Sequence, residues 1–214
     1  MREKEYIKDL LRSLLKDGTI GLDDSVIVVG AHVAEDELLR ELGFSNVLLT
    51  NIQPVDGTLS YPFAMQDATR LPYDDNSFKV GIVLNSLHHM SRPHLALTEL
   101  YRVAAKGVLG LESNDSPFMR LLVWSGLTKD DELSIDGTDD PNYVYRWTER
   151  EIEKTINSFR PHSFAKVDYF YSFHLPMEGM ARALGLICYP LLRMLRFAKQ
   201  TNTFGFFIRK RQAT

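Results

Sequence analysis

Runs rich in branched apolar residues alternate with helical stretches along the first half of the chain, and this alternation restricts the fold most. Residues 25–29 and 46–50 are such runs, as expected of strands that are covered on both faces. Between them, residues 34–42 have helical periodicity, which stops at Gly43. Strands that alternate with helices form parallel βαβ units. The pattern therefore predicts an α/β domain with a doubly wound, mainly parallel sheet.

The same patterns place the other elements along the chain. The expected strands are 25–29, 46–50, 63–65, 79–85, 107–112, 164–170 and 203–209. The expected helices are 5–16, 34–42, 93–104, 148–159 and a basic apolar segment, 177–199. Thr148 and Glu151 have the spacing of a capping box at a helix start. Residues 113–147 are expected to be irregular, and their second half is acidic.

Length and charge limit the kind of protein. A chain of 214 residues suits a single domain, 1–214, in which 113–147 is a candidate lid and 177–199 an amphipathic helical insertion. That basic insertion could contact a membrane surface or a partner, although such a stripe more often packs on its own sheet. The net charge of −3 provides no overall basic field for nucleic acid, so no nucleic-acid partner is expected. One cysteine and a charged amino terminus without a signal sequence indicate a cytoplasmic protein.

The turn after the first strand carries the first functional signal. In open α/β sheets, ligands bind outside the carboxyl ends of the strands, where the winding direction changes. Gly30 follows the first strand and permits close backbone approach, but a dinucleotide fingerprint would have further glycines, and Ala31, His32, Val33 and Ala34 occupy that space. The acids at 35–37 could supply a ligand carboxylate, or they could simply stabilise the first turn of a helix, which is the preferred interpretation.

Residues 63–90 carry a more specific combination. Asp67-Ala68 is followed by Leu71-Pro72, an acidic turn ending in Ser77-Phe78, a strand, and His88-His89. In this order and spacing the segment resembles the class I S-adenosylmethionine-dependent methyltransferases. A Glu-x-x-Arg-Val helix at 99–103 resembles the same family, as does the segment 141–148. The resemblance covers about residues 25–160.

This resemblance implies a Rossmann-like methyltransferase fold with seven strands, of which 203–209 inserts antiparallel beside 164–170. It also implies S-adenosylmethionine as the cofactor, with the adenine amino group on Asp67. The residues implied to bind the cofactor are Gly30, Asn51, Asp67, Ala68 and Asn85. His88 and His89 are the candidate catalytic residues, since histidine can act as a general base near neutral pH. No residues are assigned to a metal, because no matching ligand spacing is present.

Two departures from the family leave the function open. Val28 and Asn51 stand where the family usually has acidic residues, toward the methionine amino group and the ribose hydroxyls respectively. The first hypothesis is methyl transfer from S-adenosylmethionine to a small-molecule or glycan acceptor. The alternative is a methyltransferase-like protein with a decayed cofactor site that serves as a partner or structural subunit. A nicotinamide-dependent dehydrogenase is a weaker third hypothesis, because the glycine fingerprint is missing.

Overall fold

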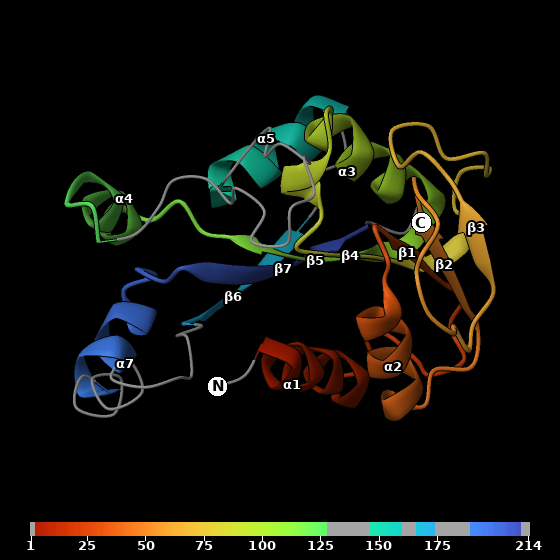
Figure 1. The fold of residues 1–214 in the computed structure, drawn as a ribbon, viewed down its shortest axis with the longest axis horizontal. Helices are drawn as coiled ribbons and strands as arrows, with labels where there is room; N and C mark the ends of the chain where they lie inside the picture. The colour runs from red at the N-terminus through yellow and green to blue at the C-terminus, as the bar shows by residue number, and fades with distance from the viewer. Residues whose placement is uncertain (1–2, 128–145, 160–165, 174–188, 211–214) are drawn as a thin grey trace.

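Seven strands form one sheet at the centre of the fold (Figure 1). The computed structural model describes residues 3–127, 146–159, 166–173 and 189–210. The strand order is β3-β2-β1-β4-β5-β7-β6, in which β1 to β5 run parallel and β7 runs antiparallel to both of its neighbours. The predicted doubly wound, mainly parallel sheet is confirmed, including the antiparallel insertion of residues 203–209.

The elements follow the expected alternation closely. The strands are β1 (Val26–Val29), β2 (Val47–Asn51), β3 (Phe63–Met65), β4 (Phe78–Leu84), β5 (Ala104–Ser113), β6 (Lys166–Ser172) and β7 (Thr203–Arg209). The helices are α1 (Glu3–Lys16), α2 (Val33–Leu42), the 3-10 turn η1 (Leu87–His89), α3 (Pro93–Val103), α4 (Pro117–Trp124), α5 (Glu149–Phe159) and α7 (Tyr189–Phe197). The capping box before α5 is confirmed, because the Glu151 N–H donates to Thr148 Oγ1 and Thr148 N–H donates to Glu151 Oε2.

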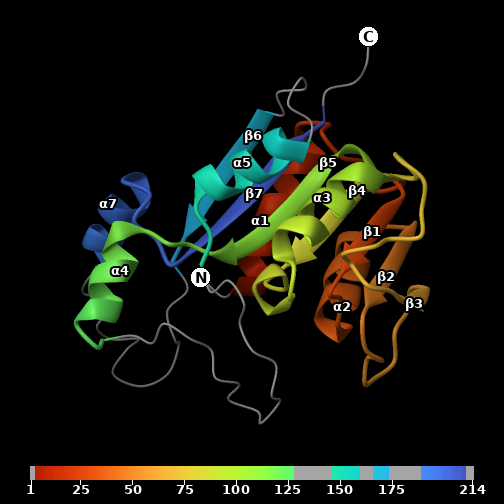
Figure 2. The same cartoon turned by 90° about the horizontal axis from the view of Figure 1, so that it is seen from above.

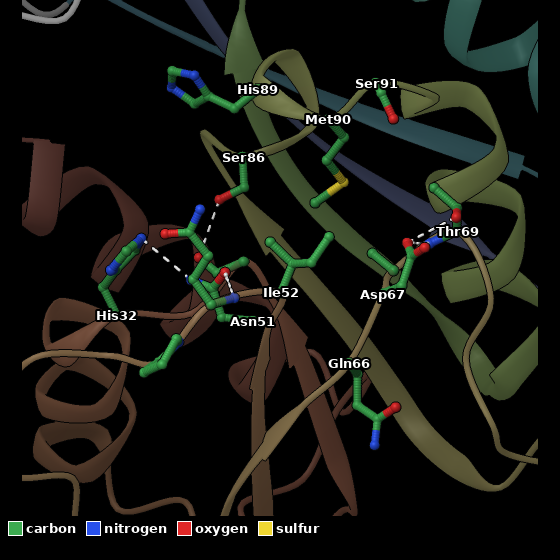
Figure 3. A pocket seen from close by; sticks show the side chains of 14 residues that line it. His32, Asn51, Ile52, Gln66, Asp67, Thr69, Ser86, His89, Met90 and Ser91 are labelled. Atoms are coloured by element: carbon green, nitrogen blue, oxygen red, sulfur yellow. Dashed lines mark hydrogen bonds between the residues drawn. The ribbon is translucent and has the colours of Figure 1, made fainter. Parts of the chain in front are cut away.

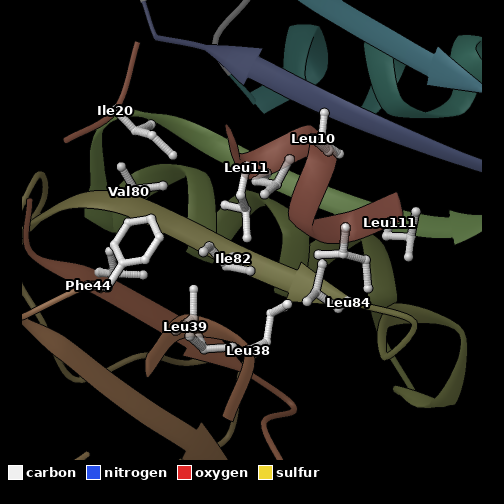
Figure 4. Packing of buried hydrophobic residues seen from close by; sticks show 14 of the residues in the cluster. Leu10, Leu11, Ile20, Leu38, Leu39, Phe44, Val80, Ile82, Leu84 and Leu111 are labelled. Carbon is white, nitrogen blue, oxygen red and sulfur yellow. The ribbon is translucent and has the colours of Figure 1, made fainter. Parts of the chain in front are cut away.

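Helices cover both faces of the sheet, which explains the continuous apolar strands. Helices α1 and α2 lie on one face and α3 and α5 on the other (Figure 1). Along β1, Val28 packs with the α1–α2 layer, whereas Ile27 and Val29 pack with the α3–α5 layer. Figure 4 shows the first of these layers, where leucines of α1 and α2 pack against apolar side chains of β4. A strand buried on both faces has no polar side, so β1 can only be apolar.

Two predicted segments need correction or lie partly outside the structure. Within 113–147, expected to be irregular, residues 117–124 form helix α4, which the Ser116 side chain caps by accepting from Met119 N–H at 3.2 Å. Residues 128–145 of the candidate lid lie outside the described residues. Of the insertion 177–199, the described part begins with α7 at Tyr189, so Pro190 lies in a first helical turn, where proline is tolerated.

The topology determines where a ligand can bind. The chain winds outward from β1 through β2 to β3, and in the opposite direction from β4 to β5. The switch point therefore lies between β1 and β4, which pair in parallel (Figure 2). The carboxyl ends of these two strands are followed by Gly30 and by Asn85. Ligand binding is expected at this edge.

Candidate functional site

A cavity of about 370 Å³ opens at the carboxyl edge of the sheet, at the switch point. Its wall combines polar and apolar groups from the turns that follow β1 to β4 (Figure 3). The lining residues are Gly30, His32, Asn51, Ile52, Gln53, Pro54, Gln66, Asp67, Ala68, Thr69, Ser86, His89, Met90 and Ser91. A volume above 300 Å³ is within the usual range of small-molecule and cofactor sites.

Gly30 brings the turn after β1 into direct contact with the turn after β4. Its φ of 66° is in the left-handed region, and a Cβ placed on it would lie 2.5 Å from the Ser86 Cβ. The Ser86 hydroxyl donates to the Gly30 carbonyl oxygen at 3.2 Å. The position thus requires glycine for both its backbone angle and its space.

Substituting Gly30 by alanine tests this contact. We expect Gly30→Ala to lower the free energy of unfolding by about 2–5 kcal/mol, from left-handed strain of ~1–2 and overpacking of ~1–3. Gly18 is a matched control, because it has a φ of 73° but nothing within 4 Å of the added Cβ. Gly18→Ala should lose only about 1–2 kcal/mol in urea denaturation. Equal losses of unfolding free energy in the two variants would show that the clash of the added Cβ with Ser86 does not destabilise the fold.

The amino terminus of α2 is capped by the side chains of its own first residues. His32 is the N-cap of α2, and its backbone N–H donates to Glu35 Oε2 at 2.8 Å in a capping box. Burial raises the pKa of the Glu35 carboxyl, while hydrogen bonds from the backbone N–H groups of His32 and Glu35 lower it. Asp36 is buried and accepts from two backbone N–H groups of the loop before β3, and Glu37 pairs with Lys4. Each of the three acids at 35–37 thus has a partner within the protein, as the preferred structural interpretation would have it.

Asn51 ends β2 and ties its turn to the turn after β1. Its Nδ2 donates to the Ala31 carbonyl oxygen at 3.1 Å, and its Oδ1 accepts from the Gln53 N–H at 3.4 Å. The next residue, Ile52, has 65% of its surface exposed and points into the cavity between Asn51 and Asp67 (Figure 3). An apolar side chain in this place gives the cavity a flat contact surface beside two polar groups.

Asp67 follows β3 on the opposite side of the cavity. Its Oδ1 accepts from the Thr69 N–H at 2.8 Å and from the Thr69 hydroxyl at 2.7 Å, which holds the carboxylate in one orientation. Asp67 and the next residue, Ala68, both line the cavity.

The Glu-x-x-Arg pair of α3 fixes the loop that continues from this turn. Glu99 accepts from the Leu71 N–H at 3.1 Å, and Arg102 donates to the carbonyl oxygens of Leu71 and Tyr73. Hydrogen bonds to Glu99 and Asp75 raise the pKa of the Arg102 guanidinium. These contacts give the sequence motif a structural role, because they hold the loop that follows the cavity wall against α3.

The two adjacent histidines have different environments. His88 is buried, and its Nδ1 lies 2.6 Å from Oε2 of Glu112, which is fully buried on β5. The other carboxylate oxygen of Glu112 accepts from the Leu87 N–H at 2.8 Å. His89 instead lines the cavity, and its ring centroid lies 4.2 Å from that of His88. One buried carboxylate therefore fixes the 3-10 turn that presents His89.

The structure brings most of the predicted site residues together. Gly30, Asn51, Asp67, Ala68 and His89 line the one cavity. His88 and Asn85 are not among its lining residues, and the Asn85 side chain donates to Glu3 at the start of α1.

Several residues of the site and its support escaped the sequence analysis, and some of them had a visible signal. Ile52 is a single apolar residue in a polar loop directly after a strand, and Ser86 is two residues beyond the end of β4, opposite Gly30. Glu112 is a charged residue at the end of a buried apolar strand, a place where charges are rarely found without a partner. Gln66 and Met90 had no comparable signal.

Comparisons with known proteins agree with this geometry. The family model described as a methyltransferase domain matches residues 38–110. The demethylmenaquinone methyltransferase of Chlamydia trachomatis is 34% identical over 64 residues, which is 30% of this chain and 28% of the relative. The match thus spans little more than a quarter of the length of that relative.

Solved structures resemble the chain over nearly its whole length. The magnesium protoporphyrin IX methyltransferase of Synechocystis, solved with bound SAH, has a TM-score of 0.58 and 14% identity, and the alignment covers 97% of this chain and 83% of that one. A SAM dependent methyltransferase from Archaeoglobus fulgidus has a TM-score of 0.59 and 12% identity, with 97% and 95% covered. At these identities the likeness concerns the fold.

Proposed function

We propose that this chain is a class I S-adenosylmethionine-dependent methyltransferase, which transfers a methyl group from S-adenosylmethionine to a small-molecule acceptor. The observation that carries the proposal is the meeting of the Gly30 turn, Asn51, Asp67 and His89 in one cavity at the switch point. The acceptors in the names of two similar proteins, demethylmenaquinone and magnesium protoporphyrin IX, are small organic molecules. They favour a small molecule over a glycan.

The chemistry of the cavity wall fits this cofactor. An adenosine needs apolar surface for a flat base and hydrogen-bonding groups for its amino group and ribose hydroxyls. Ile52, Ala68 and Met90 offer the first, and Asn51 and Asp67 offer the second. The Gly30 backbone lies so close to Ser86 that no side chain stands between the turn after β1 and the turn after β4.

Asp67 and Asn51 would hold the two halves of the adenosine. The Asp67 carboxylate, oriented by Thr69, would accept from the adenine amino group, with the Ala68 N–H beside it for a ring nitrogen. Asn51 would accept from a ribose hydroxyl through Oδ1, without the charge assistance of the family's acid. Asn85 has its side chain on Glu3, so we assign it no direct contact.

His89 would receive the proton that the acceptor releases. S-adenosylmethionine supplies an electrophilic methyl group on a positively charged sulfur. Transfer by direct displacement needs alignment first, and an oxygen or nitrogen acceptor also needs to lose a proton. His89 is the histidine at the cavity, whereas His88 is held by Glu112 and serves to position the turn. The acceptor would form its bond to the methyl carbon as the bond from that carbon to sulfur breaks, with S-adenosylhomocysteine as the leaving group, and the acceptor proton would move to the His89 imidazole.

The alternative, a partner subunit with a decayed cofactor site, rests on Val28, His32, Ala34 and Asn51. Val28 and His32 have structural roles, in the apolar layer beneath the sheet and as the cap of α2. The cavity beside them is open and has polar side chains on two sides. These observations favour the enzyme.

Calorimetric titration with S-adenosylmethionine and S-adenosylhomocysteine tests the proposal. Asp67→Ala should weaken binding about 10- to 150-fold, because losing a hydrogen bond to a charged group costs ~1.5–3 kcal/mol. Asn51→Ala should weaken it about 2- to 12-fold, the effect of ~0.5–1.5 kcal/mol for a neutral acceptor. Asp74→Ala is the control, because Asp74 is exposed and does not line the cavity.

Three outcomes would contradict these assignments. A wild type that binds neither compound at millimolar concentration supports the partner-subunit alternative. A larger loss of affinity in Asn51→Ala than in Asp67→Ala would mean that Asn51, and not Asp67, makes the stronger contact with the cofactor. An Asp74→Ala variant that binds as poorly as Asp67→Ala would attribute the loss to the change of net charge alone.

A further inference from the structure

One end of the molecule exposes an unusual concentration of large apolar side chains. The described residues include eleven exposed large apolar side chains, and six of them lie on α4, just after it, or on α7. These six, which we call the apolar end, are Leu121, Trp124, Leu127, Leu191, Met194 and Phe197. Trp124 is 83% exposed and Phe197 is 92% exposed. Apolar side chains concentrated in this way mark a surface that binds something.

The two helices of the apolar end are attached to the same part of the sheet. Both lie beyond the carboxyl end of β5 and the start of β7, at one extremity of the molecule (Figures 1 and 2). The Phe118 N–H of α4 donates to Gln200 Oε1 at 3.0 Å, and the Ser116 hydroxyl donates to the Thr201 carbonyl oxygen at 3.0 Å. Asn114 Nδ2 donates to the Lys199 carbonyl oxygen at 3.2 Å. The start of α4 and the end of α7 are thus held together.

Positive charge accompanies the apolar stripe of α7. Leu191, Met194 and Phe197 recur every third residue, and so do the cations Arg193, Arg196 and Lys199. Arg193 and Arg196 lie on α7 beside its apolar residues, and Lys199 follows the helix. The cations line a groove of about 610 Å³ whose other walls are residues of α1 and β6, Asp9 among them. Lys199 also pairs with Glu149 at 2.7 Å, so the two arginines carry most of the positive charge available to a ligand.

We propose that the apolar end docks the protein on an anionic lipid surface. A helix with exposed apolar residues beside arginines is the pattern of interfacial helices, which bury the apolar face and leave the cations among anionic headgroups. Tryptophan at such a surface suits the boundary between headgroups and acyl chains. No helix among the described residues is long and apolar enough to cross a bilayer, so contact would be with one leaflet.

The positive charge of the apolar end also favours a lipid surface over a second copy of the chain as its binding partner. A two-fold interface places the same patch of both subunits together, which would gather Arg193 and Arg196 of both copies within one interface. Such like charges oppose association, whereas anionic headgroups attract them.

Vesicle co-sedimentation of the full chain tests the proposal. We expect binding to vesicles that contain phosphatidylglycerol, little binding to phosphatidylcholine alone, and weakening with salt. Arg193→Ala with Arg196→Ala should weaken binding about tenfold or more, since each cation near the surface contributes ~1 kcal/mol. Trp124→Ser with Phe197→Ser should abolish it. The matched control, Arg150→Ala with Lys154→Ala on α5, removes the same charge from exposed positions and should bind as the wild type does.

The unmodified protein gives a second measurement. It has two tryptophans, of which Trp147 is fully buried, so a blue shift of the emission on adding anionic vesicles would report Trp124 entering the lipid. Absence of sedimentation and of the shift would overturn the proposal. So would an equal loss in the α5 control, or a stable dimer in sedimentation that Phe197→Ser dissociates. Each readout is independent of methyl transfer.

Discussion

Glu112→Leu is expected to lose about 3–5 kcal/mol of the free energy of unfolding, the usual effect of removing one partner from a buried carboxylate–imidazole pair. The substitution leaves the buried His88 ring and the Leu87 N–H without the carboxylate that now contacts both. Urea denaturation measures the loss. Glu112→Gln should lose less, because its amide oxygen can still accept from the Leu87 N–H.

A double-mutant cycle shows whether the loss comes from the pair. His88→Leu alone should also be destabilising, since it leaves the Glu112 carboxylate buried without its imidazole partner. The double variant should lose much less than the sum of the two, about 1–3 kcal/mol for the orphaned Leu87 N–H. Additive losses would mean that His88 and Glu112 stabilise the fold separately.

His89→Asn is expected to lower the rate of methyl transfer roughly 10²–10⁴-fold, the usual contribution of a general base. Transfer of a labelled methyl group from S-adenosylmethionine to the acceptor measures the rate. Calorimetry with S-adenosylhomocysteine should show a much smaller change, because the proposed contacts with adenosine come from Asp67 and Asn51. The wild-type rate should fall as pH decreases through the range in which histidine is protonated, and His89→Asn should lack this dependence.

His94→Asn is the control for this variant. His94 is exposed on α3, contacts the Trp147 ring at a tilt and does not line the cavity, so its loss should leave the rate almost unchanged. A full rate in His89→Asn would show that the proton leaves by another route. Equal rate losses in the two variants would point to a general effect on α3 and the turn before it.

Most of the sheet was predictable because its strands are covered on both faces. A buried strand such as β1 must be continuously apolar, and this pattern is visible without any knowledge of its neighbours. Helix α4 was missed because it has only eight residues and exposes much of its apolar surface, so its periodicity resembles neither a core helix nor a loop. The antiparallel β7 was predictable only through the family resemblance, since periodicity contains no information on strand direction.

The candidate site was predictable in part for a similar reason. Residues that follow successive parallel strands meet at one edge, which explains the proximity of Gly30, Asn51 and Asp67. The different environments of His88 and His89 could not be read from their positions, because the two are adjacent in one turn. Their orientation depends on Glu112, which is 24 residues away along the chain from His88 and on another strand.

The capping of α2 has a consequence for which nucleotides the site can accept. The free N–H groups at a helix start, with the positive end of the helix dipole, are what dinucleotide folds use to bind a pyrophosphate. In this chain the carboxylate of Glu35 and the side chain of His32 already occupy the start of α2. An incoming diphosphate would meet a negative charge where it needs a positive one. The two missing glycines of the fingerprint and the self-capped helix would thus act together against NAD and similar cofactors, whereas a sulfonium nucleoside without phosphate needs no contact with that helix.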